Sequence, residues 1–328
     1  MVYIETESVD AAFHFSVEEY IVKNYPWDEP VLMIWQAAQC AMLGSNQIAE
    51  AEIDMEIAAL NGIRVVRRSS GGGTIFTDMG TLLYTFIMPY TQENSPWEVA
   101  AAIIVKALNN MGVPAVIEGR NDILVDGGKV SGLAQYIRNG RVCSHGSLLY
   151  DADLATLSSL LTVDEEKVRS KALRSVRSRV TNIRNHLTTR NLTTREFWEA
   201  LKLEIFQNKA IKRHELTELQ LDEINIIYRE KYANDEWTYG RAPKFTFHGS
   251  KRFGAGKIEF FIDVKGGIVV GCSIKGDFLC KLPIHELEEI FVSKALNRKA
   301  FEEALEGVSL SPYLGNVTKD EIIECVFG

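Results

Sequence analysis

The sequence lacks the features that would place it in several broad classes of protein. It has five cysteines in 328 residues and no Cys-x-x-Cys pair, so we expect reduced thiols rather than a disulfide framework or a structural zinc site. Its most apolar early stretch, residues 31–43, contains Gln36 and Gln39 and falls short of the roughly 20 apolar residues that span a bilayer. The first ten residues, MVYIETESVD, lack the basic and apolar regions of a secretory signal. We therefore predict a cytoplasmic protein that does not enter a membrane.

Positive charge is also scarce. Lys and Arg number 36 against 44 Asp and Glu, which gives a formal net charge of −8. Because binding along a nucleic-acid backbone depends on a basic surface, we expect no nucleic-acid partner. The two common nucleotide-binding motifs, Gly-x₄-Gly-Lys-Ser/Thr and Gly-x-Gly-x-x-Gly, are both missing. The shares of hydrophobic residues (46%) and charged residues (24%) are those of an ordinary globular protein and exclude a disordered chain.

The periodicity of apolar residues predicts a mixture of helices and strands over the first 240 residues. Helices are expected at 11–25, 96–111, 153–161, 193–207 and 219–232. In the first helix, the apolar stripe leaves Glu18, Glu19 and Lys23 for solvent. Strands are expected at 31–35, 64–66, 82–88, 115–118, 122–125, 129–131 and 134–137, with hairpin turns at 126–128 and 138–140.

Residues 237–243 are rich in turn-forming residues and contain a proline, and the pattern of predicted elements changes after them. They therefore predict a linker. Residues 257–278 then alternate strands with Gly-rich turns, and residues 284–305 contain two amphipathic helical stretches. The length of the chain allows about two domains. We therefore predict an α/β (α+β) protein with one domain over residues 1–245 and a small second domain over residues 246–328.

The segment RVVRRSSGGGTIFTD at 64–78 places three glycines after a predicted strand and beside two arginines. Glycine allows unusual backbone angles, so Gly71 to Gly73 could direct successive N–H groups at one anion. Arg68 adds a planar donor suited to phosphate or carboxylate. The alternative is an exposed hairpin tip beside a solvated basic residue.

The segment GRNDILVDGGKVSGLAQ at 119–135 contains a hairpin that carries Lys129. If its ammonium projects into a cleft, it would neutralise negative charge that grows on a phosphate or carboxylate in a transition state. The alternative is a solvated surface lysine. Asp122 could hold a Mg²⁺ ion that accompanies a nucleotide, because Mg²⁺ favours one or two carboxylates plus phosphate oxygens.

Two further segments contain reactive or charged side chains. Cys143 and His145 lie two residues apart and therefore on one face of a predicted strand, where they could form a nucleophile and base pair; the alternative is a buried structural histidine. Lys171, Arg174, Arg177 and Arg179 form a basic run. Such a run is usually a solvated face, but in an acidic chain it could cover an anionic ligand or contact an acidic partner.

Taken together, RRSSGGGTIFTD (67–78), GRNDILVDGGKVSGLAQ (119–135), SHGSLLYDADL (144–154) and SVRSRVTNI (175–183) resemble, in order and spacing, the lipoate–protein ligase family. The resemblance covers residues from about 10 to 245, and residues 246–328 resemble the small accessory domain of that family. It implies a biotin/lipoate ligase-like mixed-sheet catalytic domain over 1–245, related to biotin–protein ligases and octanoyltransferases, with a small C-terminal α/β accessory domain.

The resemblance also implies an activity and partners. Lipoate and MgATP would give lipoyl-AMP and pyrophosphate, and the lipoyl group would then pass to one lysine of an acceptor lipoyl domain. That acceptor would be a glycine-cleavage H-type protein or a dehydrogenase E2 subunit. In related ligases the small domain rotates between the two half-reactions, and residues 237–250 would serve as the hinge.

Site residues follow from the resemblance position by position. Lys129 corresponds to the central catalytic lysine. The nucleotide contacts correspond to Arg68, Gly73, Thr74, Ile75, Phe76 and Lys129. The lipoyl pocket corresponds to Ser70, Gly71, Gly72, Gly132 and His145. Asp122 would orient Lys129, bind Mg²⁺ or receive the proton of the acceptor amine.

The chain departs from the usual pattern of the family at several polar positions. The usual Gly-Arg-x-Gln-Asn is Gly44 to Ile48 here (GSNQI), and His-Asp is Thr77-Asp78. Gly-Asn-x-Asn-Tyr is GTLLY at 80–84, Gly-Asn-Ala is GLA at 132–134, and His-His-Gly is SHG at 144–146. We therefore expect a divergent paralogue that retains adenylation but has a specialised acyl pocket or acceptor surface.

Two other functions remain open from the sequence. One is an ATP-independent transferase that moves octanoyl or lipoyl groups between carrier proteins through a thioester on Cys143. The other is a non-catalytic protein that binds a lipoyl domain, against which the presence of Lys129 argues.

Overall fold

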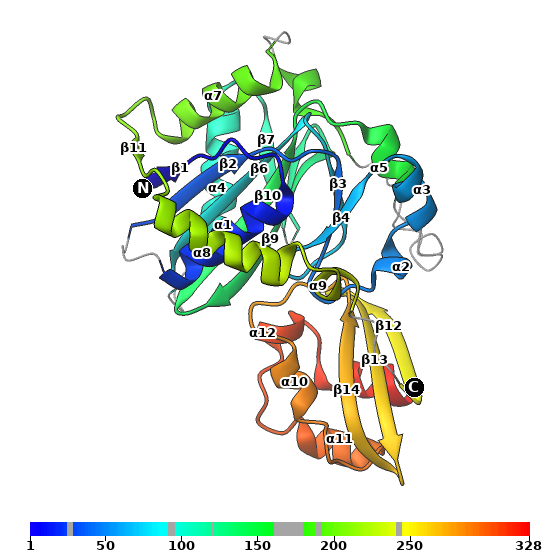
Figure 1. Ribbon diagram of the computed structural model, residues 1–328. Coiled ribbons are helices and arrows are strands. Elements are labelled where there is room, and N and C mark those ends of the chain that lie inside the picture. The colour runs from blue at the N-terminus through cyan, green and yellow to red at the C-terminus, as the bar shows by residue number, and fades with distance from the viewer. Residues whose placement is uncertain (25–28, 91–95, 120, 161–179, 188–191, 241–244) are drawn as a thin grey trace.

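A computed structural model describes residues 1–24, 29–90, 96–119, 121–160, 180–187, 192–240 and 245–328. Its larger part is built on an eight-stranded mixed sheet (Figure 1). The strands in spatial order are β11 (Lys212–Arg213), β1 (Val2–Ile4), β2 (Val31–Trp35), β6 (Thr81–Pro89), β10 (Arg141–Leu149), β9 (Gly128–Arg138), β8 (Asp122–Val125) and β7 (Ala115–Glu118). β1 runs parallel to β11 and β2, and the other neighbours pair antiparallel.

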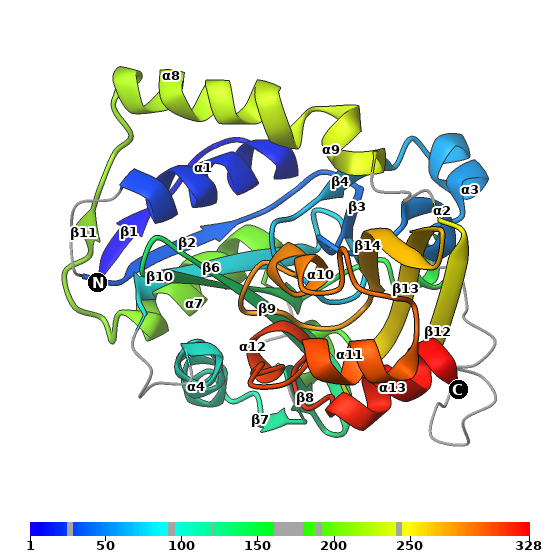
Figure 2. The same cartoon turned by 90° about the horizontal axis from the view of Figure 1, so that it is seen from below.

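Helices cover both faces of this sheet (Figure 2). One face carries α1 (Ala11–Asn24) and α8 (Glu218–Ile227), which continues as a π-helical turn, η3 (Tyr228–Tyr232). The other face carries α4 (Pro96–Asn110) and α7 (Thr194–Ile205). β2 shows how the strand period of two divides the core: Val31, Met33 and Trp35 pack toward α1, while Leu32 and Ile34 pack on the opposite side. Both faces are therefore buried.

A second sheet of three strands carries residues 68–74, which we call the glycine segment. Its order is β4 (Arg64–Arg67), β3 (Cys40–Leu43), β5 (Ile75–Thr77), so residues 68–74 form the connection between its two outer strands. The short helices α2 (Ala49–Glu52), α3 (Met55–Leu60) and α5 (Leu154–Leu160) accompany this sheet, and η2 (Ile183–His186) follows later in the chain. This small sheet lies beside the main sheet (Figure 1), and its 68–74 connection reaches the central strand β10, where Ser70 Oγ lies 2.6 Å from His145 Nε2.

The C-terminal part has its own sheet and its own apolar core. β12 (Phe247–Phe253), β13 (Gly256–Lys265) and β14 (Ile268–Gly276) form an antiparallel sheet. Four helices pack against it: α10 (His285–Glu289), α11 (Arg298–Ala304), α12 (Ser311–Leu314) and α13 (Lys319–Phe327). The strands expected within 257–278 and the two helices within 284–305 are confirmed. The domain boundary between residues 245 and 246 stays a prediction, which this separate core supports.

Two expectations about elements were wrong in detail. The two strands expected at 129–131 and 134–137 are one strand, β9, because Gly132 does not interrupt the ladder. Residues 237–239 of the expected linker belong to a helix, α9 (Asp235–Tyr239), which the buried Arg67 guanidinium holds through the carbonyls of Trp237 and Thr238. The expected linker residues 241–243 lie outside the described residues. Within the described ranges, no helix combines the length and apolar character needed to cross a membrane.

Candidate active site

A pocket of about 150 Å³ opens between the main sheet, the glycine segment and the C-terminal part. One part of its lining is apolar and comes from Phe15, Trp35, Met42, Ile75 and Leu83. Another part is polar and comes from Arg68, Thr74, Asn121, Lys129, His145 and Ser147. The wall is completed by Gly72, Gly73, Gly132, Leu133, Ala134, Gly146 and Leu279. The pocket therefore suits a ligand with an apolar tail and an anionic head.

The glycine segment is shaped by Arg68. Its guanidinium is buried and donates to four oxygens: the carbonyls of Met42, Gly71 and Gly73 and the hydroxyl of Ser70. Burial lowers the pKa of Arg68 to about 10. The alternative of an exposed hairpin tip is thus ruled out, because the arginine holds the segment inward.

The glycine amides do not all face the pocket. Gly72 has a positive φ of 90°, and its N–H donates to the Phe278 carbonyl of the C-terminal part at 2.9 Å. A Cβ on Gly71 would lie 2.8 Å from the same carbonyl. Two of the three glycines therefore allow the C-terminal part to approach closely, a role that the sequence did not reveal.

Lys129 stands at an irregularity in the β8–β9 ladder. The register shifts between Ile123, which pairs with Ser131, and Leu124, which pairs with Lys129. Such bulges re-aim side chains, and they are common beside active sites. The Lys129 ammonium lies 2.7 Å from Asp122 Oδ1, and both side chains are about one-third exposed, at 35% and 34%. Lys129 lines the pocket, so the expected projection into a cleft is what the structure shows.

The expected magnesium role of Asp122 finds little support in the surrounding residues. Its carboxylate is paired with Lys129, whereas Mg²⁺ prefers an octahedral set of oxygens. Within the described part of the chain, three or more possible metal ligands gather only at Glu18, Cys143 and His145. Asp122 thus offers one carboxylate, which suits an ion that arrives with nucleotide phosphates, and the Mg²⁺ assignment stays a prediction.

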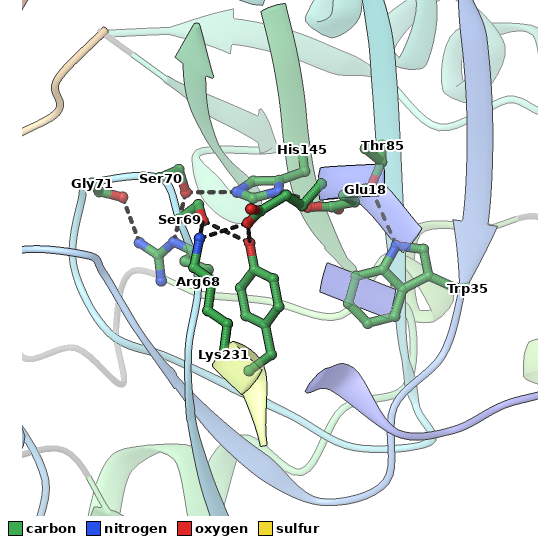
Figure 3. Close-up of polar contacts among 11 residues, drawn as sticks. Glu18, Trp35, Arg68, Ser69, Ser70, Gly71, Thr85, His145 and Lys231 are labelled. Carbon is green, nitrogen blue, oxygen red and sulfur yellow. Dashed lines mark hydrogen bonds and ion pairs between the residues drawn. The ribbon is translucent and has the colours of Figure 1, made fainter. Parts of the chain in front are cut away.

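His145 lies in the pocket wall and is joined to the glycine segment (Figure 3). Its Nε2 lies 2.6 Å from Ser70 Oγ, and its Nδ1 lies 3.0 Å from Glu18 Oε2. Ser70 and Gly71 do not line the pocket themselves but lie directly behind it. The expected pocket residues His145, Gly72 and Gly132 do line it.

Helix α1 supplies two buried carboxylates that the sequence interpretation left for solvent. Glu18 is 1% exposed and Glu19 is 3% exposed. That expectation was wrong because α1 is buried on two sides: Glu18 faces Thr85 and His145 of the main sheet, and Glu19 faces η3, which packs over α1. Glu19 binds Lys231, Lys23 and the Tyr232 hydroxyl. No residue pattern in α1 itself distinguishes this burial from an exposed pair of glutamates.

Cys143 lies on the same strand face as His145, as expected, but not in the pocket. Its side chain is fully buried among the apolar residues beneath α1. Burial raises the pKa of its thiol well above the ordinary value. A thiol in this setting is a poor nucleophile.

Other predicted residues are placed apart from the pocket or lie outside the described chain. Thr74 and Ile75 line the pocket, whereas the Phe76 side chain packs in the core beside Ala41 and Val65. The basic residues Lys171, Arg174, Arg177 and Arg179 lie outside the described residues.

Solved structures with a similar architecture are known. The crystal structure of P. falciparum LipL1 in complex with lipoate matches with a TM-score of 0.82 at 23% identity and covers 98% of both chains. A lipoate-protein ligase A bound with ATP matches with a TM-score of 0.63 at 23% identity, over 74% of this chain and 98% of that one. At these identities the two structures establish the shared fold, and the mixed-sheet architecture expected from the resemblance is confirmed.

The sequence comparisons identify the family. Residues 10–206 match the lipoyl protein ligase A/B catalytic domain, and residues 242–326 match the bacterial lipoate protein ligase C-terminus. Lipoate-protein ligase LplJ of Bacillus subtilis is 36% identical over the full length of both chains. The chain therefore belongs to the lipoate–protein ligase family of enzymes.

Proposed function

We propose that this enzyme activates lipoate with ATP to lipoyl-AMP and transfers the lipoyl group to one lysine of an acceptor lipoyl domain. The observation that carries the proposal is the pocket, where the Lys129 ammonium faces the same space as the glycine segment and an apolar wall. The LipL1 structure was determined with lipoate and the ligase A structure with ATP. Both ligands suit a pocket of this composition.

The two parts of the pocket lining indicate how lipoate would lie. Its hydrocarbon chain and dithiolane ring would pack against Trp35, Phe15 and Leu83. Its carboxylate would then point toward Lys129, and the phosphates of ATP would lie along residues 72–75. The buried apolar surface would supply affinity, while the lysine would set the orientation.

In the first step, a carboxylate oxygen of lipoate attacks the α-phosphorus of ATP. The new carbon–oxygen–phosphorus linkage forms as the bond from the α-phosphorus to the pyrophosphate oxygen breaks. Lys129 stabilises the negative charge that this transfer concentrates on the phosphate, and Asp122 holds the ammonium in place at 2.7 Å. The protein needs no nucleophile of its own, because the substrate carboxylate plays that part.

In the second step, the amine of the acceptor lysine attacks the acyl carbon. The amide bond forms as the bond to AMP breaks, and the amine loses its proton. We propose that the acceptor is the lipoyl domain of a glycine-cleavage H-type protein or of a dehydrogenase E2 subunit. Asp122 is the carboxylate nearest to Lys129 that could receive that proton.

Intact-mass spectrometry tests the whole reaction. Purified H-type and E2 lipoyl domains are incubated with the enzyme and lipoate, with and without MgATP, and their intact masses are measured. A lipoyl-sized gain that requires ATP supports the proposal and identifies the acceptor. Modification without ATP, from an acylated carrier protein, would contradict it.

Replacing the central lysine tests the first step directly. We expect Lys129→Ala to lower lipoate-dependent exchange of pyrophosphate into ATP by at least about 100-fold, because the charge that stabilises the transition state is lost. Lys106→Ala, which removes an exposed lysine from α4, serves as the control and should exchange normally. Full exchange by Lys129→Ala would contradict the assigned role.

The buried state of Cys143 weighs against the thioester transferase. Its thiol lies outside the pocket lining, and burial raises its pKa. We expect Cys143→Ala to retain ligase activity in the same assay, whereas a thioester mechanism would require that activity to disappear.

A further inference from the structure

A continuous chain of hydrogen bonds joins the wall of the pocket to the glycine segment (Figure 3). Arg68 Nε donates to Ser70 Oγ at 3.0 Å, and Ser70 Oγ lies 2.6 Å from His145 Nε2. His145 Nδ1 lies 3.0 Å from Glu18 Oε2. All four side chains are nearly or fully buried, so water does not compete for these contacts.

With a neutral His145 imidazole, the chemistry of the groups gives this chain a single direction. A carboxylate only accepts hydrogen bonds, so His145 Nδ1 carries the proton that faces Glu18. In a neutral imidazole, Nε2 then accepts, and Ser70 must donate to it. Ser70 can do so because its oxygen accepts from Arg68. Every hydrogen bond thus runs from Arg68 toward Glu18.

Glu18 also ends a second chain that arrives from the apolar side of the pocket. Trp35 Nε1 donates to Thr85 Oγ1 at 3.2 Å, and Thr85 Oγ1 donates to Glu18 Oε1 at 2.5 Å. Trp35 lines the pocket. One buried carboxylate therefore ends both chains: it accepts directly from His145 and Thr85, which link it to the glycine segment and to Trp35.

The arrangement of Ser70, His145 and Glu18 resembles a nucleophilic triad, but the environment of Ser70 argues against a role as a nucleophile. Ser70 Oγ is fully buried, already accepts from Arg68 and does not line the pocket. A metal ion is also disfavoured. Both Glu18 oxygens and both His145 nitrogens have hydrogen-bond partners, and the nearby Cys143 thiol is fully buried.

We propose that Glu18 is a positioning residue for adenylation, a role that rests on the proposed function. Its carboxylate holds His145 in the Nδ1–H tautomer, which makes Nε2 the acceptor that orients Ser70. Ser70 in turn holds Arg68, whose Nη2 donates to the carbonyls of Gly71 and Gly73, each at 2.8 Å. The carboxylate beside the acyl part of the pocket therefore sets the backbone of the segment that would contact the nucleotide.

The chain offers a matched control for this proposal. Glu19 is the next residue of α1 and is equally buried, but it makes no contact with His145: it contacts Lys231 and Tyr232, which reach the glycine segment at Ser69 and not at Ser70 or Arg68. Glu18→Gln and Glu19→Gln each remove one buried negative charge with little change of shape. A merely structural effect would be similar in the two variants.

The first readout is lipoate-dependent pyrophosphate exchange into ATP. We expect Glu18→Gln to lower kcat by about 100-fold, because displacements of about 1 Å can cost this much, while the KM for lipoate changes far less. Glu19→Gln should lose thermal stability but keep the wild-type kcat. A wild-type kcat in Glu18→Gln, or equal losses of kcat in both variants, would overturn the proposal.

The second readout does not depend on activity. In ¹⁵N NMR spectra of the unliganded protein, the His145 ring should be almost entirely the Nδ1–H tautomer in the wild type and in Glu19→Gln. Glu18→Gln should show a mixture of both tautomers, since an amide can donate as well as accept. An unchanged tautomer in Glu18→Gln would overturn the proposal even if kcat falls.

A third variant covers the case in which Glu18→Gln does not fold. Ser70→Ala breaks the chain in its middle and leaves the His145–Glu18 contact intact, so we expect a fall in kcat with the Nδ1–H tautomer retained. A wild-type kcat in this variant would overturn the proposal. If the wild type shows no exchange with lipoate, the proposed function fails, whereas the tautomer measurement still tests the hydrogen-bond chain.

Discussion

At the scale of single residues, the three consecutive glycines, Gly71 to Gly73, meet different steric and backbone requirements. A Cβ on Gly71 would lie 2.8 Å from the Phe278 carbonyl and 3.1 Å from Cys280 Sγ. Gly72 has a positive φ of 90°, which side chains disfavour. A Cβ on Gly73 would meet no atom within 4 Å. The run of glycines therefore serves close packing at its start and leaves open space at its end.

This difference predicts opposite results for two similar substitutions. Gly71→Ala should lower the free energy of unfolding by about 1–3 kcal/mol, because the new methyl group overpacks a backbone contact. Gly73→Ala should leave it nearly unchanged and serves as the control. Urea denaturation of both variants measures the effect, and equal midpoints would contradict this account of Gly71.

At the scale of elements, helix α1 is held to η3 by charge as well as by apolar packing. Glu19 Oε2 lies 2.5 Å from Lys231 Nζ and accepts from the Tyr232 hydroxyl at 2.7 Å. Burial acts to raise the pKa of Glu19, but Lys231 and the hydrogen bonds from Lys23 and Tyr232 lower it to about 2. The ionised form is therefore strongly favoured in the folded protein.

Because the pKa of Glu19 is lowered in the folded protein, the free energy of unfolding depends on pH. Glu19 contributes its full stabilisation above its ordinary pKa of 4.5 and loses it as the pH falls toward about 2. Over this window, the wild type should lose up to roughly 3 kcal/mol more free energy of unfolding than Glu19→Gln does. Denaturation curves for both proteins between pH 5 and 2 provide the measurement. A difference in the free energy of unfolding that does not change with pH would contradict the prediction.

At the scale of the whole molecule, one segment of the C-terminal part lies across the catalytic part. The Phe278 carbonyl accepts from Gly72 N, and the Lys281 carbonyl accepts from Ile137 N at 3.1 Å. Leu279, between them, lines the pocket. Access to the pocket and the position of the C-terminal part are thus coupled.

This arrangement gives a direct test of the expected domain rotation about residues 237–250. If binding of lipoate and ATP moves the C-terminal part, the amide hydrogens of Gly72 and Ile137 should lose their acceptors together. We expect faster hydrogen exchange at both amides in the adenylate-bound enzyme, measured by NMR, with the Ala115 amide of strand β7 as an unaffected reference. Unchanged protection at both sites would show that the two parts stay together.

Local patterns in the sequence were sufficient for much of the fold. The hairpin turns expected at 126–128 and 138–140 follow from Asp-Gly and Asn-Gly pairs, and Asp126, Gly127, Asn139 and Gly140 all have positive φ. The helix expected at 96–111 is α4, Pro96–Asn110, because its apolar spacing and its stop signals agree. The resemblance of four short segments was sufficient for the family. Each of these depends on neighbouring residues or on residue identity alone.

Only the tertiary structure decided which side chains meet. Glu18 belongs to the first helix, Arg68 to the glycine segment and His145 to β10, so no local pattern links them. The burial of Glu18 depends on β6 and β10 of the main sheet, where Thr85 and His145 contact its carboxylate far along the chain from α1. The inward turn of Arg68 and the contact between Gly72 and Phe278 likewise join distant segments. The sequence by itself therefore determined the main helices, several strands and the family. Long-range packing decided the hydrogen-bond chain and the wall of the pocket, because burial and hydrogen-bond partners exist only once the chain has folded.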